Sequence, residues 1–164
     1  MVSPVDLRAR RSRTASADRI LSPAQAREGG AVRIEVIEGI GPAHASALSH
    51  AGVTHVRHLI QRAATAGGRE TLARETGLST TQLLEWLNHI DLMRIRGVGA
   101  EYSDLLEAAG VDSPVELAQH SPAHLATLLA QTNAEHPLVR RVPSEKVLAA
   151  WISEARTLPR LVTH

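Results

Sequence analysis

Two short glycine-containing runs in this chain have the composition of an anion-binding backbone. The first is Gly39-Ile40-Gly41-Pro42 and the second is Gly97-Val98-Gly99, at a constant offset of 58 residues (39 to 97, 41 to 99). Glycine permits a left-handed backbone or the close approach of a ligand. A helix that begins directly after the second glycine presents free N–H groups and the positive end of its dipole, which together hold a phosphate. The runs therefore predict phosphate binding by backbone amides.

Side chains near the two runs would modify this binding. His44 lies in the first turn of the helix expected after the first run, and Arg94 and Arg96 come just before the second run. Glu101, in contrast, lies in the first turn after the second run and would repel a phosphate. The alternative interpretation is that both runs are simply tight corners between helices.

A pair of arginines far along the chain is a further candidate for phosphate binding. Arg140 and Arg141 lie between two prolines and could clamp a phosphate, or could pair with an acidic neighbour such as Glu135 or Glu145. With this pair included, the predicted nucleic-acid-binding residues are Gly39, Ile40, Gly41, Pro42, His44, Arg94, Arg96, Gly97, Val98, Gly99, Arg140 and Arg141.

The sequence lacks the patterns of common catalytic and metal centres. Cysteine is absent, so there is no thiolate ligand or cysteine nucleophile. Four of the 9 histidines cluster in sequence, at positions 44, 50, 55 and 58, but no His-Glu-x-x-His pattern occurs. Acidic residues are scattered singly, whereas a two-metal nuclease needs a carboxylate cluster. We predict no catalytic residue, no metal and no cofactor, and hence not an enzyme.

The spacing of apolar residues predicts helices on both sides of each run. A helix from Ser79 or Thr80 to about Met93 leads into the second run, and Ser144 caps the last helix. Pairs of serine and proline at 113–114 and 121–122 begin two more helices. Trp86 and Trp151 should take equivalent places in the two halves. Because each half has few large side chains, we expect one shared core.

Charge is unevenly distributed along the chain. The formal net charge is +1, but residues 1–31 hold six arginines against three acidic residues, so the remainder is mildly acidic. We expect residues 1–31 to be a flexible basic tail, which could touch nucleic acid or an acidic partner, or could simply be solvated. A mildly acidic body is unusual for a dedicated DNA-binding domain. No apolar run approaches the roughly 20 residues of a membrane span, and we expect a cytoplasmic protein.

Three segments resemble a bacterial family of tandem helix-hairpin-helix proteins of unknown function. They are Ile37-Glu38-Gly39-Ile40-Gly41-Pro42, residues 92–106 and Leu138-Val139-Arg140-Arg141-Val142-Pro143, within a resemblance that covers about four-fifths of the chain. Members are often labelled as similar to the DNA-binding part of flap endonucleases. The resemblance implies a sequence-independent DNA-binding fold and does not imply nuclease activity.

These observations combine into one expectation for fold and function. We predict an all-α protein in which two helix-hairpin-helix repeats, residues 32–94 and 95–164, pack as one compact helical body after the tail. The predicted function is non-catalytic, sequence-independent binding of nucleic acid, DNA before RNA, through hairpin amides. The alternative is a protein-interaction or scaffold module without a nucleic-acid role, which the mildly acidic body favours.

Overall fold

A computed structural model describes residues 32–164, and in this range the chain is all helical. The predicted all-α class and compact helical body are confirmed for this range, while the predicted basic tail, residues 1–31, lies outside it. The elements in chain order are η1 (Ile34–Val36), α3 (Pro42–His50), α4 (Val56–Ala63), α5 (Ala66–Thr76), α6 (Thr80–Leu92), α7 (Ala100–Ala108), α8 (Pro114–Leu117), α9 (Pro122–Glu135) and α10 (Glu145–Thr157).

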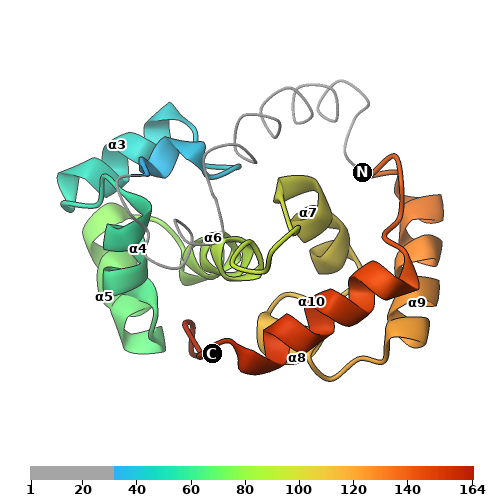
Figure 1. Ribbon diagram of the computed structural model, residues 1–164. Coiled ribbons are helices and arrows are strands. Elements are labelled where there is room, and N and C mark those ends of the chain that lie inside the picture. Colours follow the sequence, from blue (N-terminus) through green and yellow to red (C-terminus); the bar gives the residue numbers. More distant parts are fainter. Residues whose placement is uncertain (1–31) are drawn as a thin grey trace.

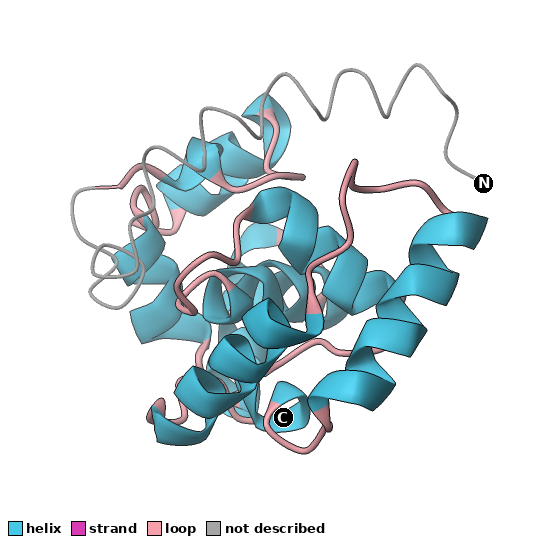
Figure 2. Cartoon of the chain, turned by 45° about the vertical axis from the view of Figure 1, so that its right-hand side comes forward, coloured by secondary structure: helices cyan, strands magenta, loops and turns pink. Residues whose placement is uncertain are grey.

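The helices form two groups that are joined by α6 and α7. Figure 1 shows α3, α4 and α5 on one side of the molecule and α8, α9 and α10 on the other, with α6 and α7 between them. Figure 2, turned by 45°, shows the same body, with an extended loop between α9 and α10. The two halves follow one plan, because α3 and α7 each begin directly after one of the two glycine runs.

Side-chain caps fix where several of these helices begin. The hydroxyl of Ser79 accepts a hydrogen bond from the amide of Gln82, and the hydroxyl of Ser144 accepts one from the amide of Val147. Such caps satisfy an otherwise unpaired amide in the first helical turn. The predicted caps are thus confirmed, and equivalent bonds begin α5, α8 and α9 at Thr65, Ser113 and Ser121.

The segment before the first glycine run is shorter than expected. The structure has a single 3₁₀ turn, η1, where the sequence suggested a helix. This turn is held from outside itself, since Ile34 donates its amide to the carbonyl of Thr54 and Val56 donates to Val32. Pairing with the α3–α4 connection therefore replaces helical hydrogen bonds at this point. The second run, in contrast, does follow a long helix, α6.

The apolar side chains form two clusters, so the expectation of one shared core was wrong. The first cluster contains Trp86 and spans residues 32–93, and the second contains Trp151 and spans residues 92–158. The C-terminal residues then return to the first half, where Val162 is buried in the first cluster. Each half is therefore packed around its own tryptophan, and the last residues connect the halves.

Candidate nucleic-acid interface

The first glycine run has the backbone geometry that an anion site needs. We call residues 39–42 hairpin 1. Gly39 has a φ of 89°, and α3 begins at Pro42 after the extended Gly41. Ile40 is buried, as expected for a residue that anchors the hairpin in the core. In the described part of the chain, the amides of Gly41, Ala43 and His44 donate to no carbonyl. These amides are therefore available to a ligand at the start of α3.

The imidazole of His44 contacts hairpin 1, and both of its ring nitrogens have hydrogen-bond partners within the protein. Its Nδ1 lies 3.1 Å from the carbonyl oxygen of Gly39, and its Nε2 lies 3.3 Å from the side-chain nitrogen of Gln82. A carbonyl only accepts hydrogen bonds, so Nδ1 carries the hydrogen and Nε2 accepts from the amide of Gln82. The ring also packs on Trp86, with centroids 5.3 Å apart. His44 therefore positions hairpin 1, and its predicted contact with nucleic acid stays a prediction.

The second glycine run lies at a cavity. We call residues 97–100 hairpin 2. Gly97 has a φ of 90°, and Val98 is buried as Ile40 is. The amides of Glu101 and Tyr102, in the first turn of α7, donate to no carbonyl of the described residues. The cavity has a volume of about 320 Å³ and is lined by Gly99, Glu101, Tyr102, Leu138, Val139, Arg140 and Arg141.

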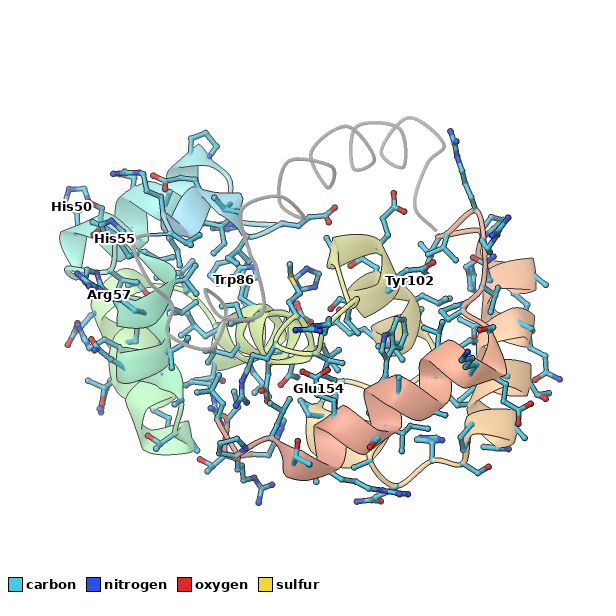
Figure 3. All side chains as sticks on the ribbon, viewed as in Figure 1. His50, His55, Arg57, Trp86, Tyr102 and Glu154 are labelled. Atoms are coloured by element: carbon cyan, nitrogen blue, oxygen red, sulfur yellow. The ribbon has the colours of Figure 1, made fainter. Side chains whose placement is uncertain are left out.

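The cavity joins residues that are forty positions apart in sequence. Tyr102 donates its hydroxyl to the carbonyl oxygen of Arg141 at 3.2 Å, and its ring packs on Trp151 with centroids 5.3 Å apart. Figure 3 shows Tyr102 reaching from α7 toward α10. Both arginine side chains are exposed at the rim. The structure therefore brings together three predicted residues, Gly99, Arg140 and Arg141, and adds Tyr102.

An asparagine that sequence analysis missed shapes the loop on the far side of the cavity. The side-chain oxygen of Asn133 accepts the amides of Leu138 at 2.9 Å and Val139 at 3.0 Å. Its side-chain nitrogen donates to the carbonyl oxygen of Val139 at 3.1 Å. These three bonds fold residues 136–139 back along the end of α9, and so place Arg140 opposite α7. An asparagine at a helix end followed by a proline was the available sequence signal.

Arg94 is buried in the body of the protein, which argues against its assignment as a phosphate ligand. Only 5% of its surface is exposed. Its guanidinium contacts the carboxylate of Asp91 at 2.7 Å and donates to the carbonyl oxygen of Pro159 at 3.0 Å. Burial raises the pKa of Asp91, and Arg94 opposes that effect. Arg96 is exposed, but its amide donates to the carboxylate of Glu154 at 3.1 Å, which places an acid beside hairpin 2.

A second polar cluster, also missed from sequence, lies where α6 meets α7. Nδ1 of the buried His89 lies 3.2 Å from the hydroxyl of Ser103 and 3.8 Å from carboxylate oxygens of both Asp104 and Glu107. Burial alone would lower the pKa of His89, but Glu107, Asp104 and Glu38 raise it above its usual value. The signal in sequence was weak, since only the spacing of 104 and 107 places two acids on one helical face.

Comparison with known proteins gives a family for the chain. A family model described as "Domain of unknown function (DUF4332)" matches residues 38–158, which include both hairpins and the cavity. No curated protein and no solved structure matches the chain. Among the described residues, no helix combines the length and the apolar character needed to cross a membrane.

Proposed function

This chain belongs to the DUF4332 family, and we propose that it is a non-catalytic protein that binds the phosphate backbone of nucleic acid, DNA above all, without reading sequence. The observation that carries the proposal is the cavity at the start of α7. The cavity is lined by the first turn of α7, where the amides of Glu101 and Tyr102 donate to no carbonyl of the described residues, and by two exposed arginines, Arg140 and Arg141, from a different part of the chain. A phosphate in this cavity would meet hydrogen-bond donors on one side and guanidinium groups on the other.

The charge around the cavity limits how tightly a phosphate would bind. Two arginines contribute positive charge, and Glu101 in the same lining removes part of it. If two phosphates are neutralised, the logarithm of the binding constant should fall with the logarithm of salt concentration with a slope of about −1.8. Binding should therefore be modest and should be strongest at low salt. Hairpin 1 would contribute open amides without an arginine partner, as a secondary contact.

The experiment is fluorescence anisotropy of the full chain with labelled duplex DNA, single-stranded DNA and RNA at two salt concentrations. The test variant replaces both Arg140 and Arg141 by alanine. Its matched control replaces Arg57 and Arg74, exposed arginines on α4 and α5, and so changes the net charge equally. We expect the test variant to bind about tenfold more weakly, equivalent to about 1.4 kcal/mol, and the control to bind nearly as the wild type does.

A variant that removes a negative charge strengthens the same test. Glu101→Gln removes the acid from the cavity, so binding should become several-fold tighter if phosphate occupies this position. Equal loss of affinity in the test and control variants would mean that general charge drives binding and that the cavity plays no part. That result would contradict the proposal.

A protein partner is the second candidate, and the mixed charge of the cavity favours it. Glu101 on one wall and Arg140 with Arg141 on the other could hold a peptide segment that carries both signs of charge. The absence of binding to all three nucleic acids at low salt would reject the first candidate and favour this one.

A further inference from the structure

We propose that His89, Asp104 and Glu107 form a binding site for one divalent metal ion of the zinc class. The site lies at the junction of α6 and α7 and is separate from the cavity beside hairpin 2. The proposal does not depend on nucleic-acid binding, and its test needs no nucleic acid.

The positions of the three ligand atoms suit a small cation. Nδ1 of His89 lies 3.8 Å from an oxygen of Asp104 and 3.8 Å from an oxygen of Glu107. All three ligand atoms lie within 4.8 Å of one another. A tetrahedral zinc ion with bonds of about 2.0–2.2 Å places its ligands about 3.4 Å apart. The two separations from Nδ1 of His89 therefore need to shorten by about 0.4 Å each, and the two carboxylate oxygens start within 4.8 Å of each other.

The donor set indicates which kind of metal the site would prefer. One imidazole nitrogen and two carboxylate oxygens suit zinc and neighbouring transition metals, whereas calcium takes six to eight oxygens and magnesium keeps most of its water. Three protein ligands leave a further coordination position. Water could fill it, as could the carboxylate of Glu38, which acts electrostatically on His89. The negative charge of the surrounding carboxylates would stabilise a dication.

One carboxylate oxygen of the cluster has no hydrogen-bond donor among the described residues. Oε1 of Glu107 is buried, and it accepts no hydrogen bond from any described residue. Its separation of 3.8 Å from His89 is too long for a hydrogen bond. A buried carboxylate oxygen without a partner is costly, and a coordinated cation would satisfy it. Together with the arrangement of the three groups, this oxygen without a hydrogen bond points to a cation.

Accessibility of the cluster is also appropriate for a metal ion. His89 is only 7% exposed, which keeps bulk water away from its nitrogen. The side chains of Asp104 and Glu107 are 21% and 30% exposed and leave a path from solvent. An ion bound here would link the helix that ends the first half to the helix that begins the second. It would thereby resist separation of the halves.

The test is isothermal titration of the metal-stripped full chain with zinc chloride, together with thermal unfolding with and without zinc. We expect one zinc ion per chain and a rise of several degrees in Tm at zinc concentrations well above Kd. Asp104→Asn and Glu107→Gln keep the shape of each side chain and change groups that are partly exposed, so both variants should fold. Each should weaken zinc binding at least about tenfold.

Two half-buried histidines in the first half provide the matched control. His55 and His58 lie close together, with ring centroids 5.2 Å apart, and Figure 3 places His55 on the far side of the molecule from Tyr102 of α7. The double variant His55→Ala, His58→Ala should retain zinc binding and the rise in Tm. The proposal is overturned if the chain binds no zinc in a saturable manner. It is equally overturned if binding is lost in the control while Asp104→Asn and Glu107→Gln retain it.

Discussion

Each hairpin contains a glycine that is required by packing as well as by the turn. Gly39 and Gly97 have φ values of 89° and 90°, a region that side chains with a Cβ rarely adopt. A Cβ at either position would also lie 3.1 Å from Nε1 of a tryptophan, Trp86 in the first half and Trp151 in the second. The predicted equivalence of the two tryptophans is confirmed by this shared contact. The first glycine of each run thus serves the fold, whatever ligand binds.

Substitution of this glycine should therefore destabilise the protein. We expect Gly39→Ala and Gly97→Ala each to lower the free energy of unfolding by at least about 1–2 kcal/mol, from the left-handed backbone alone. Gly41→Ser is the control, because the backbone of Gly41 has an ordinary φ of −80° and a Cβ at this position would meet no atom within 4 Å. A serine at this cap position should be neutral or slightly stabilising. Urea unfolding measures all three variants, and equal losses in all three would contradict the explanation.

At the level of elements, the corner between α6 and hairpin 2 is held by a buried ion pair. Asp91 and Arg94 are each about 6% exposed at their side chains and lie 2.7 Å apart. The raised pKa of Asp91 reflects the cost of burying its charge. Such a pair is costly to break and contributes little compared with apolar residues of similar size. Arg94 therefore connects the end of α6 to Pro159 through buried contacts.

Because the Asp91–Arg94 pair is buried, single and double substitutions of the pair should change the free energy of unfolding by different amounts. Arg94→Ala leaves the carboxylate of Asp91 buried and unpaired and should cost about 3–5 kcal/mol of unfolding free energy. The double variant Asp91→Leu, Arg94→Met removes both charges and should recover most of that loss. Chemical denaturation with a double-mutant cycle measures the difference. A double variant that is no more stable than Arg94→Ala would show that packing, and not the unpaired charge, determines the cost.

At the scale of the whole molecule, the C-terminal residues fasten the two halves together. Val162 is buried in the first apolar cluster, and Thr163 donates its amide to the carbonyl oxygen of Ala64 at 2.9 Å. The buried guanidinium of Arg69 donates to the carbonyl oxygen of Thr163 and also to the end of α4. From the sequence, Val162 and Thr163 were assigned to the second half. In the structure they contact residues of the first half.

Removal of residues 161–164 should consequently weaken the first half. Loss of the buried Val162 side chain costs about 1.5–3 kcal/mol, and the lost partner of the buried Arg69 costs about 1–3 kcal/mol. We expect faster hydrogen exchange in α4 and α5, with α9 little affected. Removal of His164 alone is the control, since this residue is exposed, and it should change stability by less than about 0.5 kcal/mol. Uniform loss of protection in both halves would contradict a local role.

Much of the fold could be predicted from the sequence, because interactions between residues close in sequence determine the helices. The serine caps at 79 and 144, the first glycine of each run and the apolar spacing of α6 act within a few residues, so their positions determine the helices and turns directly. The repeated run also indicated two matching halves and their equivalent tryptophans. Only the tertiary structure decided which polar groups meet. Arg94 donates a hydrogen bond to a carbonyl oxygen 65 residues away. Arg140 lines the same cavity as Gly99, and His89 lies beside Asp104 and Glu107. These pairings depend on how helices pack across long sequence separations, which no local pattern encodes.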